Sequence, residues 1–141
     1  MTEQQIIDYI REEYKNRNTS VYRTAKEIGY RPQTIYDWFR FKTHITLDGL
    51  TDILQYFGRT PAVRDKDGKY HKDILRYLKR AVKGNEKWVY ALFDKPKYGK
   101  ENIRLWTEGK RGIKVCKLVE ILNVLDAKLV ILRSKNNGRT V

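Results

Sequence analysis

Few residues of this 141-residue chain are suited to bond-making chemistry: one cysteine and two histidines. Cys116 lies between the apolar residues Val115 and Leu118, a position that favours a packed or half-buried thiol over an activated nucleophile. His44 and His71 are scattered, and with a single cysteine they do not make a convincing zinc site. No glycine-rich phosphate loop appears. We therefore expect no enzyme, no bound metal and no cofactor.

The charge of the chain indicates its partner more clearly. Thirty Lys and Arg residues oppose seventeen Asp and Glu, a formal net charge of +13. The excess is uneven, since residues 1–68 carry a net +1 and residues 69–141 a net +12. Clustered cations release counterions when they bind a polyanion, so this charge favours nucleic acid over a merely solvated basic surface.

The rest of the composition is that of a folded intracellular protein. The chain is 40% hydrophobic, and its single cysteine excludes an internal disulfide. It begins with polar residues, and its apolar stretch near the end, Leu129 to Leu132, is too short to cross a bilayer. We expect a cytoplasmic protein that has no membrane contact.

An internal repeat organises the sequence. When the chain is shifted by 68 positions without a gap, its two halves align, mostly at apolar and aromatic positions. Trp38 then meets Trp106, and Ile45 meets Ile113. Each half is near the lower size limit for an independent core, so packing the halves together would stabilise both. The alignment predicts a duplicated unit at 1–64 and 72–133, a connector at 65–71 and a flexible basic tail at 134–141.

Each repeat predicts four helices and one extended segment. Ile6, Ile7 and Ile10 recur at helical spacing after the polar residue Thr2, Thr19 or Ser20 can cap the next helix, and Gly29 marks a turn. The helices are expected at about 3–15, 20–28, 33–41 and 47–56, then at about 72–83, 86–95, 100–108 and 115–125. Thr60–Arg64 and Lys128–Arg133 would pair as a small ribbon about a pseudo-two-fold axis, with Pro61 at an edge position. The predicted fold class is all-α, with two tandem four-helix repeats and this two-stranded ribbon.

A known family shares this pattern of small, turn and apolar positions. In the first repeat the pattern comprises Ala25, Gly29, Ile35, Trp38, Ile45, Leu47, Leu50, Ile53 and Leu54. In the second it comprises the later part alone: Ile103, Trp106, Gly109, Ile113, Leu118, Ile121 and Leu122. Both resemble the lambda-repressor-like (Cro/repressor-type) helix-turn-helix family. The resemblance implies a compact helical unit from a bacterium or phage whose third helix enters the major groove of double-stranded DNA.

The resemblance also implies which side chains contact DNA. Ile35 and Trp38 would face the core, and the residues at the start and on the outer face of the third helix would read bases: Arg31, Gln33, Thr34, Tyr36, Asp37 and Arg40. Glutamine can pair with adenine, arginine with guanine, and the threonine methyl group can meet thymine. Ser20, Lys42 and His44 would contact phosphates. The alternative is that all of these are ordinary solvated side chains.

The second repeat departs from the pattern. Phe93 replaces the small Ala25, and Lys97 replaces the turn glycine, which predicts a changed interhelical angle or a longer turn. The third helix there carries Glu101 and Glu108 on its outer face, and carboxylates repel phosphate. Cations surround the same helix, so we expect DNA contacts from Lys97, Lys100, Asn102, Arg104, Lys110, Arg111 and Lys114.

These observations predict a sequence-specific DNA-binding transcription regulator, acting as a repressor. The first repeat would supply most base readout and the second mainly affinity for phosphates. The chain would bind as a monomer with a pseudo-two-fold axis or as a homodimer. Two alternatives stay open: a non-specific nucleic-acid-binding protein, and a protein-interaction module on a helix-turn-helix scaffold. In a variant of the second alternative, only the first repeat has lost DNA binding.

Overall fold

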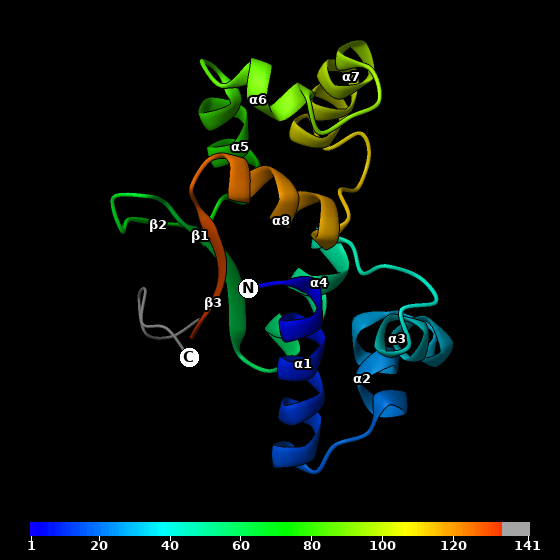
Figure 1. Cartoon of the computed structure of the whole chain (residues 1–141). Coiled ribbons are helices and arrows are strands. Elements are labelled where there is room, and N and C mark those ends of the chain that lie inside the picture. The colour runs from blue at the N-terminus through cyan, green and yellow to red at the C-terminus, as the bar shows by residue number, and fades with distance from the viewer. Residues whose placement is uncertain (134–141) are drawn as a thin grey trace.

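A computed structural model describes residues 1–133 of the chain, most of them helical (Figure 1). The basic tail expected at 134–141 lies outside the described residues. No helix within residues 1–133 combines the length and the apolar character needed to cross a membrane. The helices are α1 (Glu3–Arg17), α2 (Val21–Ile28), α3 (Pro32–Phe39), α4 (Leu47–Tyr56), α5 (Ile74–Val82), α6 (Glu86–Tyr90), α7 (Pro96–Thr107) and α8 (Val115–Val124). The strands are β1 (Arg59–Arg64), β2 (Tyr70–His71) and β3 (Lys128–Arg133).

The helices of the first half begin and end close to the predicted positions. Thr2 caps α1 in a reciprocal capping box with Gln5, and Ser20 caps α2 by accepting a hydrogen bond from the backbone N–H of Arg23. Gly29 ends α2 at φ +80°, a conformation that glycine adopts without steric cost. α3 stops at Phe39, two residues before the predicted end, because the chain turns through Phe41 at φ +57°.

The two predicted extended segments pair as expected, but they belong to a sheet of three strands in the order β2-β1-β3, all antiparallel. The third strand arises in the expected connector, where the Asp65 carboxylate accepts hydrogen bonds from the backbone N–H groups of Asp67 and Lys69 and closes a hairpin turn. β1 is therefore the central strand, contrary to the edge position expected from Pro61. Its proline is tolerated because β2 pairs only with Val63 and Arg64, so β1 has a single neighbour at Pro61.

The two halves meet through backbone pairs that are 68 residues apart. In the β1–β3 ladder, Ala62 lies opposite Val130. A second contact, at the starts of α4 and α8, sets Thr46 opposite Lys114. There the N–H of Leu47 donates to the carbonyl of Ile113 (2.8 Å) and the N–H of Val115 donates to the carbonyl of Ile45 (2.9 Å). A shift of 68 residues turns each of these two bonds into the other.

One hydrophobic core extends through both halves. In the first half, Ile6, Ile7 and Ile10 of α1 pack with the inward faces of α3 and α4. The inner faces of α8 and β3 continue the same cluster, and the N-terminal amine of Met1 donates to the carbonyl of Leu129 (2.9 Å). This shared core agrees with the expectation that two small halves would be stabilised by packing together.

The helices of the second half deviate from the predicted bounds. α6 ends at Tyr90, five residues before the predicted end, and α7 starts at Pro96, four residues before the predicted start. Pro96 explains the early start because its fixed φ suits the first turn of a helix. The connection between these helices spans residues 91–95, whereas residues 29–31 connect α2 to α3. The connection is therefore longer, which is one of the two outcomes expected from Phe93 and Lys97, but it lies before Lys97, which belongs to α7.

Candidate nucleic-acid interface

Buried aromatic packing positions α3 on the first half. Ile35 is fully buried and Trp38 is 5% exposed, so these two residues fix which face of the helix points inward. The Trp38 ring lies directly over Gly49 of α4, where an added Cβ would come within 2.8 Å of the ring. Tyr30, in the turn before α3, contacts Trp38 edge-on and donates a 2.6 Å hydrogen bond to Asp52 of α4. The contacts of Trp38 and Tyr30 with α4 therefore fix the position of α3.

The outer face of α3 presents the side chains expected to read bases, and Asp37 links two of them. The Asp37 carboxylate accepts hydrogen bonds from Gln33 (2.8 Å) and from Arg40 (3.2 Å). The Gln33 hydrogen bond and the Arg40 guanidinium lower the pKa of Asp37 below its usual value, so the carboxylate stays charged and keeps both neighbours in a row. Tyr36 projects beside this row and is 39% exposed.

The flanking residues expected at the interface have more varied surroundings. Arg31 and Lys42 are exposed on either side of α3, and Thr34 is half-buried in its first turn. The Ser20 hydroxyl already accepts the capping hydrogen bond of α2. His44 is engaged as well, because its Nδ1 lies 3.0 Å from both carboxylate oxygens of Glu3. A phosphate contact by His44 would compete with this pair.

A different aromatic contact positions α7 on the second half. Phe93 lies against Gly99 of α7, where an added Cβ would come within 2.8 Å of the Phe93 ring. Its ring also packs on Trp106 at a centroid distance of 5.9 Å. Ile103 and Trp106 are buried, as their aligned partners in α3 are. Phe93 thus fills space beside α7. Ala25, the aligned residue of α2 in the first half, has a small side chain that does not separate α2 from α3.

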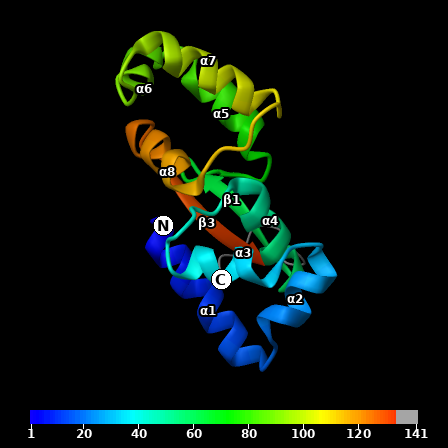
Figure 2. The same ribbon diagram turned by 90° about the vertical axis from the view of Figure 1, so that its right-hand side faces the viewer.

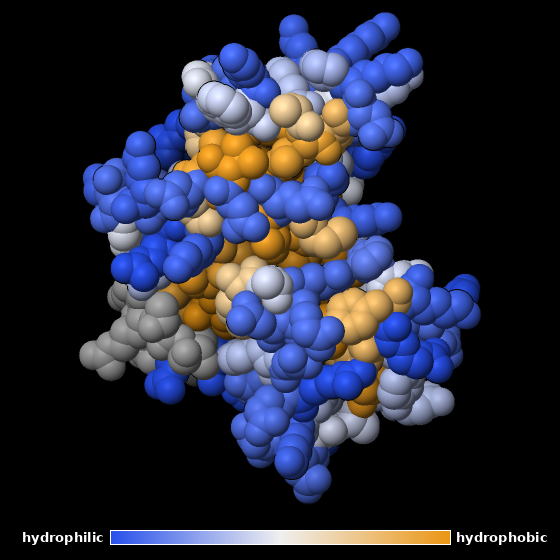
Figure 3. Space-filling view, in the orientation of Figure 1, coloured by the Kyte–Doolittle hydropathy of each residue, from blue (hydrophilic) through white to orange (hydrophobic). Residues whose placement is uncertain are grey.

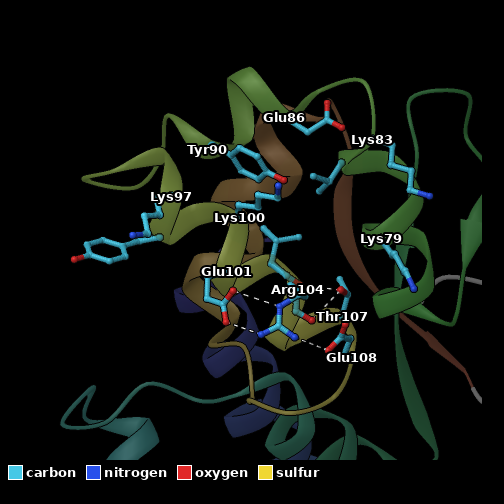
Figure 4. A pocket seen from close by; sticks show the side chains of 13 residues that line it. Lys79, Lys83, Glu86, Tyr90, Lys97, Lys100, Glu101, Arg104, Thr107 and Glu108 are labelled. Atoms are coloured by element: carbon cyan, nitrogen blue, oxygen red, sulfur yellow. Dashed lines mark hydrogen bonds and ion pairs between the residues drawn. The ribbon is translucent and has the colours of Figure 1, made fainter.

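The outer face of α7 differs from that of α3 in the number of carboxylates that bind its arginine. Arg104 donates to Glu101 (2.5 Å) and to Glu108 (3.0 Å), so two carboxylates hold its guanidinium (Figure 4). The Arg104 charge lowers the pKa of Glu101, which keeps that carboxylate ionised. Asn102 is half-buried and accepts a 2.9 Å hydrogen bond from Arg111. The remaining expected contacts on and after α7 are exposed cations: Lys97, Lys100, Lys110, Arg111 and Lys114.

A pocket of about 540 Å³ lies beside α7 and was not anticipated from the sequence (Figure 4). α5, α6 and α7 line it, with Val82 and Ile103 on its apolar wall and Lys79 and Lys83 toward α5. Lys79 belongs to α5 and Lys83 follows the end of that helix, and no motif in the sequence marks them as neighbours of a pocket. Apolar surface also shows around α5 and α8 on the face drawn in Figure 3.

The two candidate helices lie on one side of the molecule. Figure 2 turns the right-hand side of Figure 1 toward the viewer, and α3 and α7 then both face forward, with the sheet behind them. The two helices are at least 57 positions apart in the sequence, yet they lie on the same side of the molecule. Comparisons with protein-family models, curated proteins and solved structures found no match to this chain.

Proposed function

We propose that this protein binds double-stranded DNA with α3 and α7 and acts as a sequence-specific transcription regulator, a repressor in its simplest form. The observation that carries the proposal is the presentation of α3 and α7 on one side of the molecule, each seated by a buried tryptophan (Figure 2). A helix of this size fits the major groove, and two such helices on one face can occupy successive grooves.

The proposal includes a tandem duplication of a lambda-repressor-like helix-turn-helix unit. Its support is the backbone pairing at the junction, where Thr46 meets Lys114 and Ala62 meets Val130, each pair 68 residues apart. In the proposed duplication, a two-fold axis through both contacts would exchange α4 with α8 and β1 with β3. α3 and α7 would then be equivalent elements, in the way that two recognition helices are in a dimer of single-domain repressors.

The two helices are proposed to divide the work of recognition. On α3, Gln33 and Arg40 offer an amide and a guanidinium, the groups best matched to adenine and guanine edges. On α7, the Arg104 charge is shared with two carboxylates, while lysines surround the helix. Base discrimination would thus come mainly from α3, and salt-sensitive affinity mainly from α7.

The test is selection from random duplex DNA by the purified protein. Gln33→Ala/Arg40→Ala is expected to relax one half of the enriched motif, and Asn102→Ala/Arg104→Ala the other half, more weakly. Lys66→Ala is a control matched for the loss of one positive charge, because this lysine lies in the β1–β2 turn, away from α3 and α7. An enriched motif that neither reader variant alters would refute the proposed readout.

A non-specific nucleic-acid-binding function is the second candidate, and the state of Arg104 favours it. If the Glu101 and Glu108 pairs persist on DNA, α7 contributes charge without readout. If Gln33 and Arg40 likewise keep their hydrogen bonds to Asp37, neither helix reads bases. Selection then enriches no motif, although binding is measurable and falls steeply with salt.

A further inference from the structure

Three side chains capable of binding a metal converge where the two halves meet. Glu3 is the first residue of α1, His44 lies between α3 and α4, and Cys116 is the second residue of α8. One potential ligand atom from each, a carboxylate oxygen, an imidazole nitrogen and the thiol sulfur, lie within 4.8 Å of one another. The His44 Nδ1 to Glu3 distance is already 3.0 Å. Three separate parts of the chain thus bring potential ligand atoms close together.

The cluster brings together residue types that are rare in this chain. The chain has one cysteine and two histidines, and the fold places that cysteine beside one of those histidines together with a carboxylate. The other histidine, His71, also pairs with a carboxylate, Asp65, at 2.7 Å. That second pair has no thiol, because Cys116 is the only cysteine of the chain. Of the two histidine–carboxylate pairs, only the pair of His44 and Glu3 therefore has a sulfur atom beside it.

We propose that Glu3, His44 and Cys116 form a binding site for a thiophilic divalent cation, Zn²⁺ in the first instance. Sulfur, imidazole nitrogen and carboxylate oxygen are the three ligand types that zinc accepts in proteins, whereas Mg²⁺ and Ca²⁺ take oxygen ligands. A tetrahedral zinc ion with bonds of about 2.0–2.3 Å holds its ligand atoms roughly 3.3–3.8 Å apart. The three atoms lie within 4.8 Å of one another, so binding an ion requires them to move slightly closer together.

The burial of the three residues fits a site with three protein ligands. Glu3 and Cys116 are half-buried, and His44 is exposed. Solvent therefore reaches the cluster, which lets an ion enter and lets water complete the coordination as a fourth ligand. Covalent catalysis is a poorer account of the cluster. Burial, and then the negative charge of Glu3, raise the pKa of the Cys116 thiol, whereas an activated nucleophile needs a lowered one.

A cation in this site would cross-link the two halves. Its ligands belong to the first helix, to the segment that leads out of α3, and to α8, which starts at the backbone junction between the halves. The ion would thereby fix α1 against α8 and hold His44 away from other partners. Metal binding is measured on the protein alone, so the proposal stands or falls independently of DNA binding.

The experiment is a titration of the reduced, metal-free full chain with Co²⁺, which reports its ligands optically. One equivalent is expected to bind, with a thiolate-to-cobalt charge-transfer band and the visible bands of tetrahedral cobalt, and Zn²⁺ is expected to abolish both. Cys116→Ser should remove the charge-transfer band and weaken binding at least about tenfold. His44→Gln and Glu3→Gln should weaken binding while the band persists at saturation.

The matched control is His71→Gln, which breaks the other histidine–carboxylate pair and should leave the cobalt spectrum and affinity unchanged. Circular dichroism of the metal-free variants checks that each one folds. For a site at this cluster, Zn²⁺ raises the thermal unfolding midpoint of the wild type and leaves that of Cys116→Ser in place. The proposal is overturned if Co²⁺ gives no thiolate band, or if His71→Gln weakens binding as much as His44→Gln does.

Discussion

The two halves of the molecule share an element order but differ in how their exposed helix is seated. In the first half, the tight turn at Gly29 brings α2 onto α3, and Trp38 fills the space above Gly49. In the second half, Phe93 packs against Gly99 of α7, and the connection between the helices is longer. Two changes at aligned positions, Ala25 to Phe93 and Gly29 to Lys97, thus accompany a rearranged pair of helices.

A second difference is the surface beside the exposed helix of the second half. α5, α6 and α7 line an open pocket of about 540 Å³, and Tyr98 at this pocket is 54% exposed. The second half also carries most of the net charge. A rigid helix suits base readout, which demands fixed geometry, whereas phosphate affinity tolerates a looser scaffold. The contrast in packing therefore parallels the proposed division of recognition.

The largest expected effect compares the two aligned tryptophans. Trp38→Ala should lower the free energy of unfolding by about 3–5 kcal/mol, because a closely packed site cannot collapse around the cavity. Trp106→Ala should cost less, about 2–3 kcal/mol, since the helices around it already border open space. Urea unfolding measures both, and Trp88→Ala, at an exposed position, should have almost no effect. If Trp106→Ala lowers the free energy of unfolding as much as Trp38→Ala or more, the proposed difference in packing between the two halves is wrong.

Next in size is the contrast in DNA binding. Replacing Gln33 and Arg40 by alanine should cost about 1–3 kcal/mol per lost base contact on the preferred duplex, with little loss on unrelated duplexes. Replacing Lys97 and Lys100 should weaken binding to all duplexes alike and reduce the salt dependence of log K by about 2. Affinities over a range of salt concentrations measure both effects. Interchanged outcomes, with discrimination lost at the lysines, would reverse the proposed roles.

A smaller effect concerns the carboxylates of α7. Glu101→Gln/Glu108→Gln removes two negative charges and releases Arg104, so affinity for DNA should rise roughly threefold to tenfold. The same change at Glu12 and Glu27, exposed carboxylates of the first half, is the control for net charge alone. If both double variants tighten binding equally, α7 has no special position at the interface.

Sequence patterns were sufficient wherever local chemistry decides the structure. Thr2, Ser20 and Gly29 cap or terminate helices by contacts within a few residues, and the helix expected at 47–56 is present with those bounds. The pairing of β1 with β3 was also predictable, because a repeat aligns equivalent segments. The patterns failed where a distant contact decides, as at Phe93, whose packing on Gly99 and Trp106 reshapes the α6–α7 connection.

The candidate metal cluster is a clearer example of a feature that depends on distant contacts and cannot be predicted from local sequence patterns. Glu3, His44 and Cys116 are far apart in the sequence, and Glu3 resembles any other acidic residue at the start of a helix. The spacing of the histidines and the cysteine gave no ligand motif and led to the expectation of no metal. Only the packing of α1 against α8 brings the three residues together, and no local pattern encodes that contact.

The smallest expected effect is the pH dependence that arises from one ion pair of the first half. Glu13 binds Arg17 (2.6 Å) and lies 3.7 Å from Arg59, an arrangement that links α1 to the start of β1. Burial opposes ionisation of Glu13, but the hydrogen bonds from Arg17 and Tyr9 outweigh it, so the pKa lies below its ordinary value of 4.5. The alignment sets Ala81 opposite Glu13 and Ala127 opposite Arg59, so the second half has no equivalent link.

A carboxylate whose pKa is lowered by folding stabilises the folded state above its unfolded pKa and loses that contribution as the pH falls through the folded value. Glu13→Gln should therefore cost about 0.5–1 kcal/mol near neutral pH, and the difference from wild type should shrink as the pH falls below 4.5 and through the folded-state pKa. Urea unfolding at a series of pH values measures the difference. Glu86→Gln, in the second half, should show no comparable trend. A Glu13→Gln difference that stays constant with pH would mean that the link acts through packing and not through charge.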